Sequence, residues 1–361
     1  MTLATCLLTG GAGFIGCALS PLLADRFERV VAMDNLHPQI HAARTRPTAL
    51  DARVELIVAD VCAHADWERV LAQVRPDAIV HLAAETGTAQ SLTESARHAQ
   101  VNVTGMACML DALVRHAALP ERIVLASSRA VYGEGEWQRH EDGAIVDPGQ
   151  RGRAMLEAAQ WDFPGLRALP HEAGHTALHP TSVYGATKLA QEHVLSAWAQ
   201  AVGVRASVLR MQNVYGPGQS LGNPYTGIVP LFCQIARAGN SIPVYEDGAI
   251  VRDFVCVDDV ARAIFAAIDA DIQHTAPIDI GSGTPTTILQ LAQWIARRYG
   301  APAPTITGQY RHGDVRQACA RIDAARAHLG WQPHVRLDAG LERLCAWIDA
   351  HPDTTRGSLA G

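Results

Sequence analysis

The first 130 residues alternate short apolar runs with longer amphipathic stretches. The apolar runs are typical of strands buried on both faces, and they cover residues 5–8, 30–33, 54–58, 78–82 and 122–126. The amphipathic stretches between them predict helices at residues 14–23, 67–74 and 96–116. Strands and helices that alternate at this spacing predict an α/β fold with a doubly wound parallel sheet of the Rossmann type.

The pattern changes between residues 134 and 180, which are polar and rich in Gly, Pro and His. This stretch predicts at most one short helix, near residues 153–160, and we interpret it as a long insertion close to an active site. Further helices are predicted at 184–202, 229–238, 258–268, 287–299 and 338–349, with strands at 206–211 and near 242–245. Residues 352–361 are typical of a frayed tail.

These elements predict two units. Residues 1–204 would form the dinucleotide-binding domain, which carries the insertion. Residues 205–361 would form a smaller, mixed α/β domain that mainly binds substrate, with some segments returning to the first domain.

Composition excludes several classes of protein. The chain of 361 residues is 48% hydrophobic and 18% charged, which is ordinary for a compact enzyme. Its net charge of −6 and the lack of a basic block argue against a nucleic-acid partner. No apolar run approaches the ~20 residues that span a membrane. Few residues precede Gly10, and the eight cysteines form no C-x-x-C pair, so we expect a cytoplasmic protein with free thiols.

The first predicted strand runs directly into the sequence TGGAGFIG, which contains Gly10, Gly13 and Gly16. Phe14 and Ile15 open the helix that follows. In such a turn one glycine makes the tight bend, the next lets the backbone approach a pyrophosphate, and the third allows close packing of helix on strand. The strand before and the helix after this motif predict a dinucleotide site.

The second predicted strand ends in Asp34, about 20 residues after the glycine turn. A carboxylate there can accept both ribose hydroxyls of NAD and would repel the 2′-phosphate of NADP, although it could also simply cap the next turn. His37, Arg44 and Arg46 lie nearby, so NADP stays open as the less favoured cofactor. Asp60 and Val61 close the third strand, where an adenine edge could be held.

Tyr184 and Lys188 are four residues apart and therefore share one face of the helix that begins there. A phenol with a pKa near ~10 is a poor base at neutral pH, but an adjacent Lys⁺ and the positive nicotinamide ring favour its phenolate form. A lone Y-x-x-x-K arises easily by chance. Here Ser127 and Ser128 end the fifth strand at the edge of the sheet where ligands bind, which favours a catalytic interpretation.

The insertion contains His171, Glu172 and His175 in the H-E-x-x-H pattern of zinc hydrolases. That chemistry needs a stable helix that presents both imidazoles, and Gly174 and Pro180 disfavour one. We therefore expect histidines of a polar active-site lid here, and no metal site.

Four motifs carry a resemblance to a known family: TGGAGFIG, HLAA at residues 81–84, SSRAVYG at 127–133 and YGATK at 184–188. Together they resemble the extended short-chain dehydrogenase/reductases, and among these the NAD-dependent nucleotide-sugar 4-epimerases. The resemblance covers nearly the whole chain, because motifs at residues 210–218, 252–255 and 313–316 follow in the family's order.

The resemblance implies roles for individual residues. Ser128 and Tyr184 would be the proton-handling pair, and Lys188 would bind the nicotinamide ribose. The implied contacts to NAD are Gly10, Gly13, Phe14, Ile15, Gly16, Asp34, Asn35, Asp60, Val61, Leu82, Ala83, Ala84, Asn102, Tyr184 and Lys188. The implied contacts to a nucleotide-diphosphate sugar are Thr86, Gln90, Ser128, Asn213, Arg252, Arg311 and Asp314, of which Asn213, Arg252 and Arg311 would hold the pyrophosphate.

Differences from the family narrow the substrate. Related dehydratases carry an Asp-Glu pair where this chain has Arg129 and Ala130, so 4,6-dehydration is not expected. Residues 35–41, 85–92 and 212–227 resemble the branch that interconverts dTDP-L-rhamnose and dTDP-6-deoxy-L-talose through a transient 4-keto sugar. In relatives we would expect cysteine pairs within the insertion, but none lies between Cys108 and Cys233, so a structural metal is not expected.

Two other functions stay open. An NAD(P)H-dependent reductase of a dTDP-4-keto-6-deoxy-L-hexose would use the same Ser, Tyr and Lys residues. A non-catalytic NAD(P)-sensing regulator would usually lose the Tyr or the Lys, which are both present here. The resemblance also implies a homodimer that forms through helices such as 96–116 and 184–202.

Overall fold

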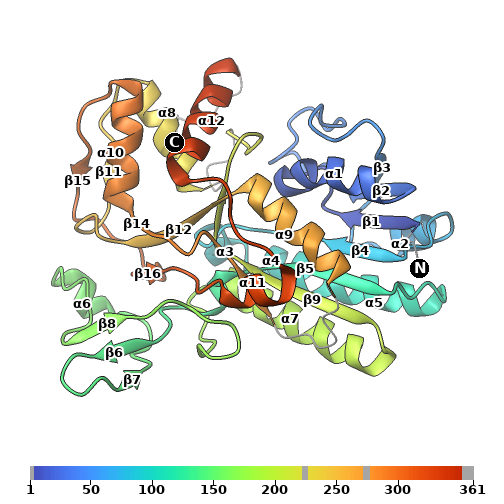
Figure 1. Ribbon diagram of the computed structural model, residues 1–361, viewed down its shortest axis with the longest axis horizontal. Helices are drawn as coiled ribbons and strands as arrows, with labels where there is room; N and C mark the ends of the chain where they lie inside the picture. The colour runs from blue at the N-terminus through green and yellow to red at the C-terminus, as the bar shows by residue number, and fades with distance from the viewer. Residues whose placement is uncertain (1–3, 222–226, 271–276, 352–361) are drawn as a thin grey trace.

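The computed structural model describes residues 4–221, 227–270 and 277–351. Its centre is a parallel sheet of seven strands in the order β13-β9-β5-β4-β1-β2-β3, which confirms the predicted Rossmann-type fold (Figure 1). The strands are β1 (Thr5–Thr9), β2 (Arg29–Asp34), β3 (Glu55–Val58), β4 (Ala78–His81), β5 (Arg122–Ser128), β9 (Arg205–Met211) and β13 (Ile278–Ile280). The strand order reverses beside β1, and ligands bind at such a reversal, outside the carboxyl ends of the strands.

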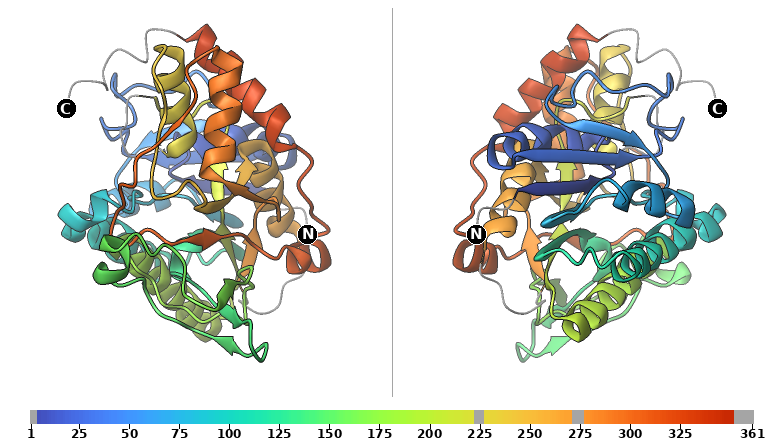
Figure 2. Two further views of the ribbon diagram at one scale, coloured as in Figure 1. Left: turned by 90° about the vertical axis from the view of Figure 1, so that its left-hand side faces the viewer. Right: turned by 90° about the vertical axis from the view of Figure 1, so that its right-hand side faces the viewer.

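Helices cover both faces of this sheet (Figures 1 and 2). One face packs against α1 (Phe14–Arg26), α9 (Val257–Asp269) and α11 (Asp323–Leu329), and the other against α2 (His64–Leu71), α5 (Gly105–Arg115) and α7 (Val183–Val202). Neighbouring residues of β1 face opposite cores: Leu8 joins the first and Leu7 the second, and both are fully buried. Burial of each such leucine stabilises the fold by about 2 kcal/mol.

The helix predicted at residues 96–116 is confirmed, but it contains a π-helical turn that the sequence did not indicate. The structure divides it into α4 (Ser95–Ala99), a π-helical turn (Gln100–Thr104) and α5, after the short helix α3 (Gln90–Thr93). The Asn102 amide in the π-helical turn donates to the Glu85 carbonyl at 3.0 Å and to the Thr187 hydroxyl at 2.9 Å. These two bonds tie the loop after β4 to α7, and π-helical turns are frequent beside functional sites.

Two expectations for the sheet also need correction. β3 was expected to be buried on both faces, but it is the edge strand, and Val58 is 54% exposed. β13 was not predicted, because three residues are too few to show a periodic pattern.

The C-terminal part of the chain forms a second core. Its strands are β10 (Asn213–Tyr215), β11 (Pro243–Val244), β12 (Val251–Cys256), β14 (Pro285–Thr287), β15 (Thr305–Ile306) and β16 (Gln317–Ala318), and its helices are α8 (Ile228–Arg237), α10 (Ile288–Tyr299) and α12 (Leu337–Ala350). These helices stand together at the upper left of Figure 1 and share one hydrophobic core. By contrast, α9, β13 and α11 return to the parallel sheet. The predicted tail at 352–361 lies outside the described residues.

The insertion is more ordered than the sequence suggested. It contains the predicted short helix, α6 (Arg153–Glu157), but also an antiparallel sheet of β6 (Trp137–Arg139), β7 (Ile145–Val146) and β8 (Leu166–Ala168). The prediction of at most one short helix is thus confirmed, whereas the three strands were not predicted. Strands of two or three residues give no measurable alternation, and here Trp137 packs edge-on against Phe163 instead, with ring centroids 5.0 Å apart.

Buried ion pairs attach the insertion to the C-terminal part. Arg151 Nε lies 2.9 Å from Glu134 Oε1, and Arg151 Nη2 lies 2.9 Å from Glu246 Oε1. The other oxygen of Glu246 is 2.9 Å from Nη1 of Arg316, which also pairs with Asp162. The side chains of Arg151, Glu134, Glu246 and Arg316 are at most 2% exposed, so the pairs are well shielded from water. We call these four residues the ion-pair cluster.

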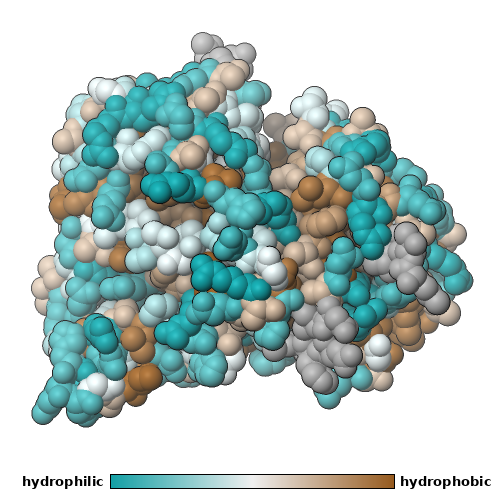
Figure 3. All heavy atoms as spheres, in the orientation of Figure 1, coloured by the Kyte–Doolittle hydropathy of each residue, from teal (hydrophilic) through white to brown (hydrophobic). Residues whose placement is uncertain are grey.

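The face of the molecule in Figure 3 is mainly hydrophilic, with hydrophobic residues in small separate patches. Within the described ranges, no helix is both long and apolar enough to span a bilayer.

Candidate active site

The glycine-rich turn between β1 and α1 has the geometry that an anion site needs. Gly10 has a φ of +67°, and a Cβ on it would lie 2.6 Å from the Ala83 backbone nitrogen, so only glycine fits. A Cβ on Gly16 would lie 2.5 Å from the Gly11 carbonyl oxygen, which shows how closely α1 packs on the turn. Gly13 precedes α1 without a side-chain cap, so the helix begins with free N–H groups that can bind a phosphate.

Asp34 faces a cavity at the end of β2. Its Oδ2 accepts a hydrogen bond from Ala12 N at 3.1 Å, and its Oδ1 accepts one from Leu36 N at 2.9 Å. The predicted cofactor and substrate residues that line this cavity are Gly10, Gly13, Asp34, Asn35, Asp60, Val61, Leu82, Ala83, Ala84 and Thr86. Arg46, a candidate for a 2′-phosphate, instead donates to the carbonyls of Val54 and Asp51 at 2.9 and 2.6 Å.

Two other predicted residues form hydrogen bonds to residues that line this cavity. Asn102 holds the Glu85 backbone, as described above, and so positions the loop that carries Leu82, Ala83 and Ala84. Gln90, predicted to contact substrate, is 2% exposed, and its amide donates to Gln39 at 3.2 Å and to Glu94 at 3.0 Å.

The structure brings the three predicted catalytic residues to one edge of the sheet. Ser128 ends β5, while Tyr184 and Lys188 lie in the first two turns of α7. The Ser182 hydroxyl caps this helix by accepting from Gly185 N at 3.0 Å, which fixes where α7 begins. Ser128 lies close enough to Tyr184 to lower the pKa of its phenol, so the two hydroxyls stand together as proton transfer requires.

The electrostatics of Tyr184 differ in one respect from the expectation. Burial raises the pKa of the phenol, whereas the hydrogen bond with Ser128 and the positive charge of Arg129 lower it. The nearby cation that favours the phenolate is thus Arg129, while Lys188 donates to the Gln191 side chain. Burial also lowers the pKa of Lys188 to about 7, against the opposing charge of Glu192. From the sequence, Lys188 and the positive nicotinamide ring were expected to favour the phenolate, and Arg129 was missed.

A buried polar network lies behind the catalytic residues. Glu192 accepts hydrogen bonds from the Ser127 hydroxyl and from Arg210, whose Nη2 is 2.7 Å away. Arg210 also donates to the Tyr132 hydroxyl at 3.1 Å, which in turn donates to Asp279 at 2.9 Å. None of these partners was predicted, because they come from four separate segments. The sequence contains one hint that these residues support the catalytic group: Ser127 is next to Ser128, and Glu192 lies one helical turn after Lys188.

The predicted substrate residues lie mainly on the other side of the site. Asn213 Oδ1 accepts from Arg129 Nε at 3.0 Å. Arg252 is 8% exposed, and the Asp314 carboxylate is close enough to both Arg129 and Arg252 to favour their charged forms. Arg311 is exposed, and its guanidinium lies 5.1 Å from the centre of the Tyr245 ring. The structure therefore groups Asn213, Arg252 and Asp314 around Arg129.

The H-E-x-x-H segment forms a turn rather than a helix. His171 is buried beside the Tyr132 ring, with centroids 4.6 Å apart, whereas the His175 side chain is 74% exposed. Burial lowers the pKa of His171 to about 3, so this imidazole is neutral. The two histidines do not face a common point, and the described residues contain no cluster of metal-ligating side chains.

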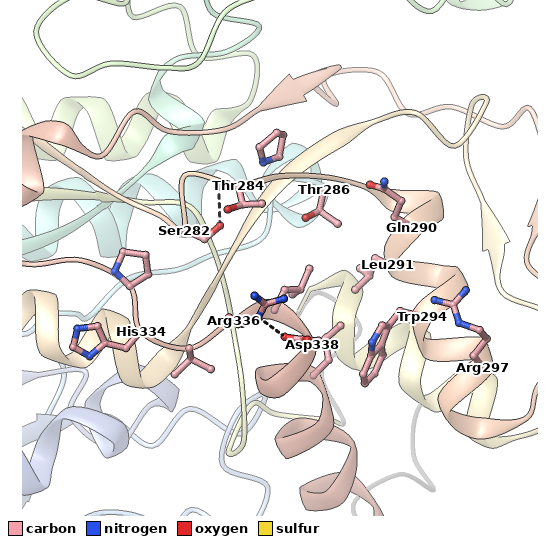
Figure 4. A pocket seen from close by; sticks show the side chains of 15 residues that line it. Ser282, Thr284, Thr286, Gln290, Leu291, Trp294, Arg297, His334, Arg336 and Asp338 are labelled. Carbon is pink, nitrogen blue, oxygen red and sulfur yellow. Dashed lines mark hydrogen bonds and ion pairs between the residues drawn. The ribbon is translucent and has the colours of Figure 1, made fainter.

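A second cavity, of about 660 Å³, lies away from these residues (Figure 4). It is lined by β14, α10 and the start of α12, with Trp294 and Arg297 on one side and Arg336 and Asp338 on the other. None of the predicted catalytic or cofactor residues contributes to it.

The fold and the position of Tyr184 define an enzyme of the extended short-chain dehydrogenase/reductase class. The model of the "NAD dependent epimerase/dehydratase family" matches residues 6–150 and 164–281. The chain belongs to this family. Its cofactor is NAD, in agreement with the prediction made from Asp34, and the glycine turn and the Asp34 cavity fit that cofactor.

Three known proteins show how similar the chain is to its relatives. It is 57% identical to the dTDP-L-rhamnose 4-epimerase of Burkholderia thailandensis, over 95% of this chain and 94% of the relative. The UDP-glucose 4-epimerase of Thermotoga maritima, solved with UDP-glucose, matches with a TM-score of 0.79 and 27% identity, over 96% and 99% of the two chains. The UDP-glucose 4-epimerase of Thermus thermophilus, solved with NAD, matches with a TM-score of 0.74 and 27% identity, over 98% and 100%.

Asp34→Asn is expected to lower the preference for NADH over NADPH by about tenfold, because removal of one charge weakens the ribose contact and ends the repulsion of a 2′-phosphate. The asparagine oxygen keeps an acceptor for one of the two backbone N–H groups that Asp34 now binds, so the melting temperature of the variant is measured alongside. Titration of the cofactor-free protein with NADH and NADPH measures both dissociation constants. Asp25→Asn, at a carboxylate that is 68% exposed, serves as the control. An unchanged ratio of the two constants would contradict the role of Asp34.

Proposed function

We propose that this chain is a nucleotide-sugar 4-epimerase that interconverts dTDP-L-rhamnose and dTDP-6-deoxy-L-talose through a transient 4-keto sugar. The reaction type is supported above all by Tyr184, which stands beside Ser128 on the edge of the sheet that carries the glycine turn, where Ser128 lowers the pKa of the phenol. The choice of sugar is supported by the 57% identity to a dTDP-L-rhamnose 4-epimerase. The 4-epimerase assignment further agrees with Arg129 and Ala130 at the positions where dehydratases need acids.

Each residue of the site has its own role in the proposed reaction. Tyr184, as phenolate, accepts the proton of the sugar 4-hydroxyl, and the Ser128 hydroxyl holds that oxygen in position by a hydrogen bond. When bound, NAD would supply reversible hydride transfer at C4 of the sugar. Lys188 holds the ribose next to the nicotinamide. Tyr184 then returns the proton to O4 when the alcohol forms again.

Inversion at C4 requires the 4-keto sugar to present its other face. Asn213 and Arg252 would hold the diphosphate through this step, so that the sugar turns about its linkage to the phosphate and is not released. An arginine suits this task, because its planar fork can bind two phosphate oxygens at once. Thr86, Arg311 and Asp314 complete the proposed substrate site.

The organisation of the whole protein is part of the same proposal. We assign dinucleotide binding mainly to residues 1–204 and substrate binding mainly to 205–361. We also propose a cytoplasmic homodimer that forms through α5 and α7. The 53% exposure of Val114 on α5 supports such an interface, since an apolar side chain gains from being covered. Light scattering on the purified protein measures the oligomeric state.

The proposed reaction is expected to proceed without added cofactor. We expect the purified protein to convert dTDP-L-rhamnose to dTDP-6-deoxy-L-talose with only the NAD that it retains, because the hydride returns to the sugar that lost it. Proton NMR follows the product, and a substrate deuterated at C4 tests the return, since direct transfer keeps the label. UDP-glucose serves as the comparison substrate.

Three outcomes would contradict this proposal. Turnover that starts only when NADPH and a 4-keto sugar are supplied would identify a reductase instead. Loss of the deuterium label would show that the hydride leaves the site. Binding of NAD without conversion of any nucleotide sugar would favour a regulator.

A further inference from the structure

Arg129 and Arg252 are neighbouring cations, each held by neutral groups. Arg252 Nη1 donates to the Val251 carbonyl at 2.7 Å, and Arg129 Nε donates to Asn213 Oδ1 at 3.0 Å. In the part of the chain that the structure describes, neither guanidinium lies within ion-pair distance of a carboxylate. Both side chains have given up much of their contact with water, which costs free energy unless an anion replaces it.

The other buried arginines around the site each have the carboxylate partner that Arg129 and Arg252 lack. Arg151 pairs with Glu134 and Glu246 at 2.9 Å, and Arg210 pairs with Glu192 at 2.7 Å. Arg316 likewise pairs with carboxylates at 2.7 to 2.9 Å. The chain therefore supplies acids to its structural arginines and leaves Arg129 and Arg252 with unused donors.

The positive charges of Arg129 and Arg252 also repel each other. Burial, followed by the positive charge of Arg252, lowers the pKa of the Arg129 guanidinium to about 9. Burial also lowers the pKa of Arg252. The charges of Asp314 and Asp253 near Arg129, and of Asp314, Glu134 and Glu246 near Arg252, offset only part of the lowering. An anion between the two guanidiniums would remove the repulsion and satisfy the free N–H groups in one step. Two adjacent phosphates suit two guanidinium groups better than a single carboxylate does, because each planar guanidinium can bind two oxygens at once.

We propose that Arg129 is a further diphosphate-binding residue, which acts with Arg252 as a two-sided clamp on the nucleotide sugar. This proposal rests on the proposed function, which supplies the diphosphate. Arg129 follows Ser128 directly and its charge reaches Tyr184, so it holds the end of the diphosphate that is nearer to the reacting sugar. The same guanidinium ties the catalytic edge of the sheet to Asn213 on β10.

The test uses calorimetric titration of the NAD-loaded protein with dTDP and, separately, with thymidine. Arg129→Met is expected to weaken dTDP binding by about tenfold to a hundredfold, the effect of losing a charge-assisted bond to an anion. Thymidine binding is expected to stay unchanged, since it carries no phosphate. Arg129→Lys, which keeps the charge but not the fork, is expected to restore part of the affinity. Arg326→Met, at a side chain that is 55% exposed, is the matched control.

The outcomes separate this inference from the proposed function. Equal dTDP affinities for the wild-type protein and Arg129→Met would overturn the role of Arg129 and leave the epimerase proposal intact. A wild-type protein that binds dTDP no better than thymidine would overturn the diphosphate site and both proposals. Circular dichroism and the melting temperature establish that each variant is folded, and the Arg129→Lys variant provides the same comparison if the methionine variant is unstable.

Discussion

Tyr184→Phe is expected to lower kcat by about 10²- to 10⁴-fold while KM and the amount of retained NAD change little. The substitution removes one oxygen atom, and with it the group that accepts the proton from the sugar O4. The ring of Tyr184 and its packing at the start of α7 remain. Initial rates on dTDP-L-rhamnose, together with the NAD content of the purified variant, measure both effects. Tyr299→Phe removes a hydroxyl of α10, which packs in the second core away from the site, and serves as the control.

The pH profile of the wild-type enzyme provides a second test of Tyr184. Because burial raises the pKa of the phenol, the phenolate fraction is small at neutral pH and grows as the pH rises. We therefore expect kcat/KM to rise with pH below that pKa. A Tyr184→Phe variant that retains half of the wild-type rate, or a wild-type profile that falls over this range, would show that another group is the base.

Glu246→Gln is expected to lower the free energy of unfolding by about 3–5 kcal/mol, because it leaves two buried guanidiniums without their shared carboxylate. Glu246 is 1% exposed and bridges Arg151 of the insertion to Arg316 of the C-terminal part. Glutamine keeps the shape and most of the volume of the side chain, so the effect reports on charge. Thermal and urea unfolding measure it, with loss of activity as the insertion detaches.

The control for this prediction is Glu342→Gln, at a carboxylate that is 53% exposed and pairs with Arg298 at 2.9 Å. Water already screens that pair, so we expect almost no change in stability. If Glu246→Gln were as stable as Glu342→Gln, the ion-pair cluster would not be what attaches the insertion.

The parallel sheet could be predicted because each of its early strands is a short apolar run between turn residues, and the chain repeats this unit. The order of the residues at β1, β5 and the start of α7 likewise predicted the cofactor turn and the catalytic group. These features depend on local sequence, since a glycine turn or a Tyr four residues before a Lys is complete within a few positions.

What could not be predicted depends on contacts between distant segments. The role of Arg129 comes from Arg252, Asn213 and Tyr184, which lie more than fifty residues away along the chain. The ion-pair cluster joins residues of the insertion to Glu246 and Arg316 in the same way. A single sequence shows the charge of each residue but not its partner. Very short strands such as β7 escaped prediction for a different reason, because their pairing with β6 stabilises them rather than their own pattern.

The return of α9, β13 and α11 to the parallel sheet has a consequence for synthesis on the ribosome. Leu19 and Leu23 of α1 are fully buried in a core that includes Val260 and Ile264 of α9, and α11 ends only at Leu329. A nascent chain that has reached residue 204 therefore carries a sheet with one face incompletely covered, and both β9 and β13 are still missing from its edge. Such an intermediate exposes apolar surface, so it stays prone to aggregation until α9 and α11 have been synthesised and cover that face of the sheet.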